Sequence, residues 1–270
     1  MNLKQPWHVL GVTFLVTLAT HANAGADVEQ WGVFETSFKV EEAEAIPIET
    51  VFAATFTQGN KSLTIPGFWD GGNTYKIRFS PPTVGKWRYK TTSRRRDLDG
   101  HEGAFTVVQP SKGNHGPMQV FETYYLRYAD GTPYHQFGTT CYAWVHQPEA
   151  TQEQTLKTLA SSPFNKIRFC VFPKNYTYNK NEPKFFAFEK NDEGEFDLNR
   201  PDIAFWRHFE RRILDLQNLG IEADVILWHP YDRWGFADMS DQVDDRYLRY
   251  CIARLSAFRN VWWSLANEYD

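Results

Sequence analysis

The residues best suited to chemistry lie near the carboxyl terminus, where Asn267 and Glu268 follow the apolar run Val261–Ala266, which is typical of a buried strand. Parallel α/β enzymes keep acid/base catalysts at such strand ends. A glutamate there, partly desolvated and near a second carboxylate, would hold its proton more tightly and could protonate a glycosidic oxygen. The alternative is an ordinary exposed glutamate. The strand, the position and the neighbouring amide together favour the catalytic role.

Other polar and aromatic side chains lie at or near the ends of three earlier apolar runs: Tyr142, Trp144, Arg168, His229 and Tyr231. Side chains at the carboxyl ends of parallel strands converge on one mouth. A cation, an imidazole, an amide, a carboxylate and several aromatic rings suit a neutral, polyhydroxylated ligand better than a phosphate. Trp144 and Trp234 are candidate platforms for stacking on sugar rings, although such rings also fill cores.

Arg168 stands in the otherwise apolar run Ile167 to Phe172, and burying an unpaired guanidinium is expensive. Its partner is either a nucleophile from a later strand or a neighbouring structural acid, and the sequence favours neither. His229 could touch substrate, hold an acid or be an ordinary core residue. His229 with Asp232 is too sparse for a metal site, so we expect no metal or other cofactor.

The elements that position these residues are four strands alternating with three helices, expected at 134–144, 164–172, 221–229 and 260–268. A capping box at Thr151–Gln154 opens the first helix, Pro201 and Asp202 open the second, and Tyr247 to Leu255 lie in the third. A long loop, 173–200, precedes the second helix. Consecutive βα units require a parallel sheet. The bare last strand favours the first half, four βα units, of a truncated (β/α)8 barrel over an open doubly wound sheet.

Residues 25–109 show a different pattern, with short β-runs separated by turn residues, which predicts an antiparallel, immunoglobulin-like β-sandwich. The runs are 31–40, 50–57, 75–79, 87–91 and 104–108. Residues 110–117 read as a linker, and a hairpin around Ala129 to Pro133 leads into the second domain, 118–270.

Residues 1–24 resemble a signal peptide, because Lys4 precedes an apolar stretch and Ala22-Asn23-Ala24 fits a cleavage site. We therefore expect a secreted or periplasmic protein without a membrane span. The remaining chain has 28 basic and 33 acidic side chains, so no basic field favours nucleic acid. The oligomeric state is not readable from the sequence.

Cys141, Cys170 and Cys251 form no C-x-x-C pair, and an odd count excludes a dense disulfide framework. One bridge between Cys141 and Cys170 is possible, but buried thiols are the favoured interpretation.

Four segments resemble known glycosidases. Ser264–Glu268 is similar to the fourth-strand Asn-Glu motif of clan A retaining glycoside hydrolases, and 137–144, 167–169 and 227–232 resemble strand ends of the apiosidase-like glycosidases. The first domain is similar to the uncharacterised β-sandwich that precedes such barrels.

The resemblance implies an exported retaining glycoside hydrolase that acts on a plant or microbial polysaccharide or oligosaccharide. Glu268 would be the acid/base, Asn267 would hold the 2-hydroxyl, Arg168 would position the nucleophile, and His229 and Tyr231 would line the subsite at the cleaved bond. The family's nucleophile comes from the seventh strand, which these residues lack, so we expect them to be inactive alone. The alternative is a non-catalytic carbohydrate-binding or surface-associated protein.

Overall fold

The first part of the chain forms two facing β-sheets. The protein is described by a computed structural model over residues 27–268, so the expected signal peptide lies outside the described residues. The larger sheet has the order β1 (Val28–Glu29), β8 (Glu102–Val108), β7 (Gly85–Ser93), β3 (Phe52–Gln58) and β4 (Lys61–Pro66). The smaller sheet has the order β2 (Phe34–Lys39), β6 (Thr74–Phe79) and β5 (Phe68–Trp69), and a 3₁₀ turn, η1, spans Pro47–Glu49.

Aromatic side chains between these sheets form one core. The rings of Phe34 and Phe105 stack with centroids 3.9 Å apart, and those of Phe56 and Phe79 with centroids 4.2 Å apart, each pair joining the two sheets. All five β-runs expected from the sequence are present as β2, β3, β6, β7 and β8. The structure adds the short strands β1 and β5 and the edge strand β4, whose largely exposed residues gave no alternating pattern. The first part of the chain is therefore a two-sheet β-sandwich.

A small antiparallel sheet connects the sandwich to the second part of the chain. It contains β9 (Met118–Phe121), β10 (Tyr125–Tyr128) and β11 (Pro133–Tyr134), in agreement with the expected hairpin. The Tyr128 hydroxyl donates to the Glu222 carboxylate at 3.0 Å, and the Tyr134 hydroxyl donates to the Asn165 carbonyl at 3.2 Å. These contacts hold the small sheet against the amino-terminal end of the parallel sheet.

The second part of the chain contains a curled, four-stranded parallel sheet. Its order is β12 (Gly138–Thr140), β13 (Lys166–Cys170), β16 (Glu222–Trp228) and β17 (Val261–Ala266), with parallel pairing throughout. The intervening helices are α1 (Glu149–Ala160), α2 (Ile203–Asn218) and α3 (Asp241–Leu255), with 3₁₀ turns η2 (Trp144–His146) and η3 (Phe236–Asp238). The expected alternation of strands and helices is confirmed.

Two local expectations in this part were wrong. Helix α1 begins at Glu149 after Pro148, without a side-chain cap, so Thr151 lies inside the helix and is no capping residue. The loop expected at 173–200 contains an antiparallel hairpin of β14 (Phe188–Lys190) and β15 (Phe196–Pro201). At α2 the expected start holds, because the Asp202 side chain accepts from the Ala204 amide at 2.8 Å.

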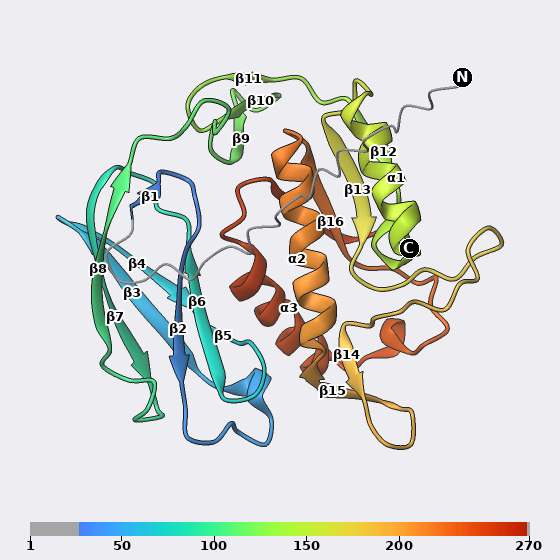
Figure 1. Ribbon diagram of the computed structural model, residues 1–270, viewed down its shortest axis with the longest axis horizontal. Helices are drawn as coiled ribbons and strands as arrows, with labels where there is room; N and C mark the ends of the chain where they lie inside the picture. Colours follow the sequence, from blue (N-terminus) through green and yellow to red (C-terminus); the bar gives the residue numbers. More distant parts are fainter. Residues whose placement is uncertain (1–26, 269–270) are drawn as a thin grey trace, which may run out of the picture.

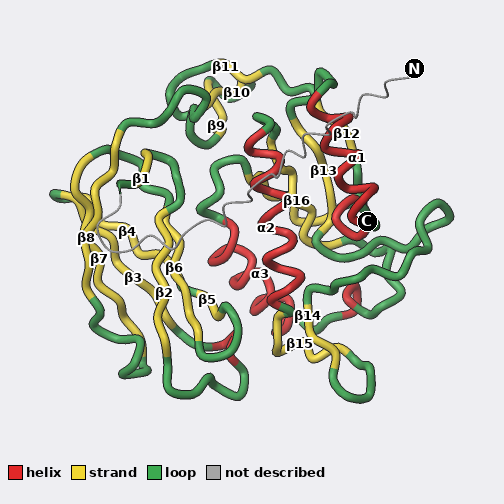
Figure 2. Tube along the Cα trace, in the orientation of Figure 1, coloured by secondary structure: helices red, strands yellow, loops and turns green. Residues whose placement is uncertain are grey.

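Helices α2 and α3 lie between the sandwich and the parallel sheet (Figures 1 and 2). Their apolar faces pack on the sheet residues Ile167, Phe169 and Val225 in one buried cluster. Their other sides meet β6, which is why this strand is buried almost continuously rather than alternately. No helix within residues 27–268 is long and apolar enough to cross a membrane.

Buried charges join the sandwich to these two helices. Arg78 on β6 reaches Glu210 on α2 with an Nη1 to Oε1 distance of 2.5 Å, and its Nη1 also donates to the Arg254 carbonyl on α3 at 2.8 Å. The Arg254 guanidinium pairs with Glu210 and with Asp70, which follows β5. This buried network links the sandwich directly to α2 and α3.

Candidate functional site

Backbone hydrogen bonds bring the carboxyl ends of the four parallel strands together. The Cys170 amide donates to the Tyr142 carbonyl at 2.9 Å, which joins the last residue of β13 to the segment after β12. The Asn267 amide donates to the Trp228 carbonyl at 3.0 Å, which joins the ends of β16 and β17. The segments that follow these strands therefore lie side by side along one edge of the sheet, called the mouth below, as the alternating pattern predicts.

Lys174 stands in this mouth between two of the predicted residues. Its Nζ lies 4.2 Å from the ring centroid of Tyr142 and 4.2 Å from that of Tyr231. The side chain is buried, with 5% of the residue exposed. Two aromatic faces at this distance stabilise a desolvated ammonium group. Sequence reasoning missed Lys174, which lies in the loop after β13, although its position just past a strand end was a usable signal.

His229 is buried in the same region as a neutral imidazole. Its Nε2 lies 3.1 Å from the Phe172 carbonyl, and its Nδ1 has no hydrogen-bond partner among the described residues. Burial lowers the pKa of His229, because the charged form would be poorly solvated there, and the contact with Phe172 opposes this only in part. One ring nitrogen is therefore left for a ligand.

Arg168 lies near a structural acid without forming a hydrogen bond to it. Its Nε is 3.9 Å from Asp224 Oδ2, which already accepts from Lys166 Nζ at 2.9 Å. The other Asp224 oxygen accepts from the Ser264 hydroxyl at 2.6 Å. Arg168 Nε is buried and has no hydrogen-bond partner among the described residues. The guanidinium is thus held close to one carboxylate and can still bind another.

Asn267 and Glu268 differ in their surroundings. Asn267 is buried, and its side-chain Nδ2 has no hydrogen-bond partner among residues 27–268. Glu268 is exposed, so the expected partial desolvation of its carboxyl group is wrong for this structure. Its φ of 54° lies in the left-handed region, which is uncommon for a residue with a side chain. The chain therefore turns sharply as it leaves β17.

Trp144 is not the sugar platform that the sequence suggested. The residue is 3% exposed and belongs to the helix-side core, where its ring packs edge-on against Phe169 with centroids 5.5 Å apart. A ring enclosed in this way cannot stack on a sugar, so its assignment to substrate binding was wrong. Trp234 is half-buried, and its indole Nε1 lies 3.2 Å from a carboxylate oxygen of Glu182.

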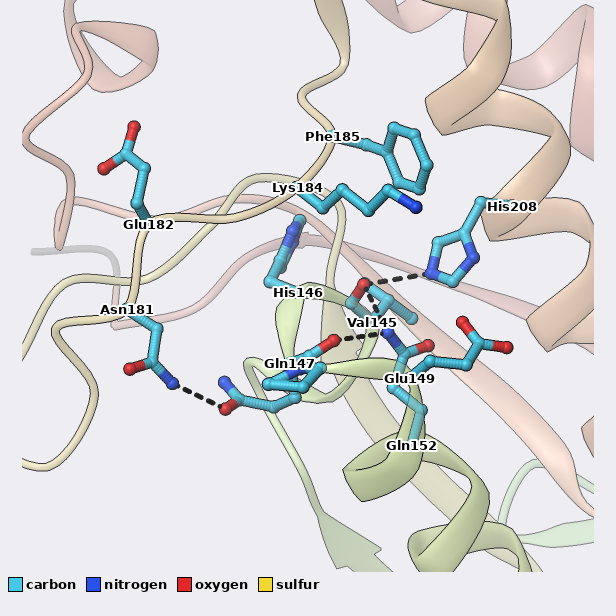
Figure 3. Close-up of a pocket in the computed structure, with 11 residues that line it drawn as sticks. Val145, His146, Gln147, Glu149, Gln152, Asn181, Glu182, Lys184, Phe185 and His208 are labelled. Atoms are coloured by element: carbon cyan, nitrogen blue, oxygen red, sulfur yellow. Dashed lines mark hydrogen bonds between the residues drawn. The ribbon is translucent and has the colours of Figure 1, made fainter.

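A cavity of about 440 Å³ lies beside this mouth, and Glu268 is not among its lining residues. Figure 3 shows the side chains that line it. It is bounded by η2, the start of α1, the loop segment 181–185 and α2. Its volume is in the range of small-molecule sites. Its lining residues are Val145, His146, Gln147, Pro148, Glu149, Gln152, Asn181, Glu182, Lys184, Phe185 and His208. None of them was among the predicted site residues.

The three cysteines are free thiols, so the bridge between Cys141 and Cys170 that the sequence left open is not formed. Within the described residues, no group of three or more His, Cys, Asp or Glu side chains is arranged to hold a metal ion.

Comparisons with known proteins give two family matches. A family model described as "Apiosidase-like, catalytic domain" matches residues 121–270. A second, described as a domain of unknown function, DUF5060, matches residues 27–94. No curated protein matches the chain.

The chain is also similar to solved structures. A crystal structure described as a "putative glycoside hydrolase" from Bacteroides vulgatus ATCC 8482 is 49% identical, with a TM-score of 0.86 over 90% of this chain and 49% of that one. The chain thus spans about half the length of this relative. A family 5 glycoside hydrolase from the same organism is 18% identical, with a TM-score of 0.41 over 56% of this chain and 32% of that chain.

Proposed function

This chain belongs to the apiosidase-like family, and on that premise we propose that it is the amino-terminal portion of an exported, retaining glycoside hydrolase. The observation that carries the proposal is the position of Asn267 and Glu268 directly after β17, where the ends of four parallel strands meet. A general acid at this place can protonate the oxygen of a glycosidic bond. The substrate class is a plant or microbial polysaccharide or oligosaccharide, and the location is secreted or periplasmic.

In this proposal the residues at each strand end have a defined role in catalysis or substrate binding. Glu268 is the acid/base, and the free Nδ2 of Asn267 donates a hydrogen bond to the 2-hydroxyl. His229 and Tyr231 line the subsite at the cleaved bond, with Tyr142 opposite Tyr231 across Lys174. Arg168, with its unbonded Nε, positions the nucleophile.

We further propose that 118–270 is the first half of a (β/α)8 barrel, joined by the linker 110–117 to an immunoglobulin-like module at 25–109. The family match and the 49% coverage of a longer relative support this. The nucleophile would come from the second half of the barrel. Because retaining chemistry needs two carboxyl groups about 5 to 5.5 Å apart, these residues alone should not hydrolyse glycosides.

The test is a leaving-group comparison in the complete enzyme. Glu268→Gln should lower kcat/KM on unactivated glycosides by about 100-fold to 10,000-fold, the usual contribution of general acid catalysis. Activated 2,4-dinitrophenyl glycosides need little protonation, so their glycosylation rate should fall much less. Azide should restore turnover of the variant by replacing the water that Glu268 would activate.

Glu195→Gln is the matched control, because Glu195 is an exposed glutamate in the β14–β15 turn. This variant should behave like the parent on both substrates. Equal activity of Glu268→Gln and the parent on unactivated glycosides would refute the assignment. Binding of polysaccharide without any hydrolysis by the parent would favour a carbohydrate-binding role instead.

A further inference from the structure

An almost fully exposed tyrosine stands in the loop that follows β13. Tyr178 has 92% of its surface exposed, although aromatic rings gain free energy when their apolar area is buried. The loop lies on the side of the molecule away from the sandwich, next to the strand ends (Figure 1). Its hydrogen bonds and ring contacts distinguish this tyrosine from an ordinary solvated loop residue.

The turn that carries Tyr178 is held at its base. The backbones of Tyr176 and Asn179 exchange hydrogen bonds of 3.2 and 2.9 Å, so Tyr178 lies at the tip of a tight turn. Asn179 is buried, its Nδ2 donates to the Lys174 carbonyl at 2.8 Å, and its Oδ1 accepts from Gln147 Nε2 at 2.8 Å. The exposed ring therefore projects from a buried and hydrogen-bonded base.

Contacts with the segment after β16 hold the same loop beside the mouth. The Asn175 amide donates to the Tyr231 carbonyl at 2.9 Å. Further along the loop, Glu182 pairs with Arg233 at 2.8 Å and accepts from Trp234 Nε1 at 3.2 Å. A ring presented by a loop that is already ordered loses little conformational entropy when a ligand binds to it.

The ring of Tyr176 connects the exposed ring to the mouth. Its centroid lies 6.3 Å from that of Tyr178 and 5.5 Å from Lys174 Nζ. The same Nζ lies 4.2 Å from the ring centroids of Tyr142 and Tyr231. Aromatic rings thus continue outward from the strand ends to the tip of the turn.

Trp234, the other candidate platform near the mouth, is less suited to stacking. The Arg233 guanidinium lies 4.8 Å from its ring centroid, and Glu182 holds its indole nitrogen. Most of the Tyr178 ring surface, in contrast, is open to solvent. A sugar unit has a face of C–H groups that can pack on such a ring while its hydroxyl groups stay in water.

We propose that Tyr178 is an aromatic platform that stacks on a sugar unit of the substrate chain outside the mouth. The substrate chain then lies over the loop after β13 as well as in the mouth, and Tyr178 is a substrate-binding residue away from the cleaved bond. The ligand class rests on the proposed function, but the contact is tested by binding, which requires no turnover. A sugar face that covers roughly 50 Å² of apolar ring surface changes the affinity about tenfold.

The experiment is affinity electrophoresis of the complete protein in native gels that contain xyloglucan, arabinoxylan, galactomannan, pectin or alginate at a series of concentrations. All proteins carry Glu268→Gln, so that the polysaccharide is not cut during the run. At least one polysaccharide should retard the protein, and adding Tyr178→Ala should raise the Kd for it about tenfold. Tyr178→Phe keeps the ring and should bind as tightly as the protein with Tyr178.

Tyr124→Ala is the matched control, because Tyr124 is 88% exposed in the β9–β10 turn, at the opposite end of the parallel sheet (Figure 1). This variant should bind polysaccharide normally. The proposal is overturned if no polysaccharide retards the protein, if Tyr178→Ala binds as tightly as Tyr124→Ala, or if Tyr178→Phe binds as weakly as Tyr178→Ala. If Tyr178→Ala weakens binding but Glu268→Gln hydrolyses glycosides normally, the platform stands and the catalytic assignment fails.

Discussion

Replacing Asp70 with Asn should destabilise the protein in a manner that depends on pH. Asp70 is 2% exposed and follows β5, and its carboxylate pairs with Lys76 at 3.0 Å, Arg207 at 3.1 Å and Arg254 at 2.8 Å. Burial alone would raise the pKa of Asp70, but the charges of Arg254 and Lys76 outweigh it and hold the pKa at about 2. The carboxylate is therefore more stable as an anion in the folded protein than in the unfolded chain.

The magnitude follows from the two pKa values. Because the folded pKa lies below the unfolded value of 3.8, the stabilisation is present above pH 3.8 and is lost as the pH falls towards 2. A difference of this size corresponds to about 2 kcal/mol at neutral pH and about 1 kcal/mol at pH 3. Asn cannot ionise, so Asp70→Asn should lose this contribution at neutral pH and approach the parent in acid.

The measurement is the free energy of unfolding in urea for the parent and Asp70→Asn at a series of pH values from 7 to 3. Carboxyl groups that share no ion-pair partner with Asp70 titrate equally in both proteins, so their effects cancel in the difference. We expect the difference to shrink by about half between neutral pH and pH 3. A difference that is the same at every pH would refute the reasoning, because the stabilisation would then not come from the ionised form of Asp70.

Two further predictions concern the thiols and one turn. Burial raises the pKa of the Cys141 thiol and raises that of Cys170 to about 12, and Cys251 is also buried. An Ellman assay should therefore detect almost no fast-reacting thiol in the native protein, and three thiols in urea. Rapid native labelling would contradict this. Gly116→Ala should lower the thermal midpoint by several degrees, since Gly116 has φ of 76° and a Cβ there would lie 2.6 Å from the Trp31 ring. An unchanged midpoint would show that this segment relaxes freely.

The parallel sheet was predictable because its strands carry their own signal. Ile167 and Phe169 alternate with polar residues whose side chains lie on the opposite face from α2 and α3, and Val225 continues the buried row on the neighbouring strand. The polar residues Arg168 and Asp224 are direct neighbours across β13 and β16. Strand type, and the ends of the last three strands to within two residues, therefore followed from local patterns. The first strand was wrong, because it was expected at 134–144 and spans only Gly138–Thr140.

The errors arose where contacts between elements, and not a strong local pattern, decide the structure. The hairpin strand β15, Phe196–Pro201, has only a short apolar alternation at Phe196 and Leu198, and it forms by pairing with the neighbouring strand β14. Trp144 looks like a loop residue in the sequence, but its indole Nε1 donates to the Gln152 carbonyl at 3.2 Å and its ring joins the core. Nothing in the sequence indicated the surroundings of Lys174 and His146, because these two side chains contact residues far away in the sequence.

Helix α2 connects the buried charges of the sandwich to the cavity beside the mouth. Its Glu210 pairs with Arg78 of β6, and two residues earlier His208 lines the cavity, with Nε2 3.1 Å from the Val145 carbonyl. On the same helix the buried Arg212 donates to Gln152 at 2.8 Å and so holds the start of α1. Because one helix carries all three contacts, the sandwich contacts the same helix that forms one wall of the cavity and that packs on the parallel sheet. In this architecture the β-sandwich therefore helps to hold α2 in place beside the strand ends.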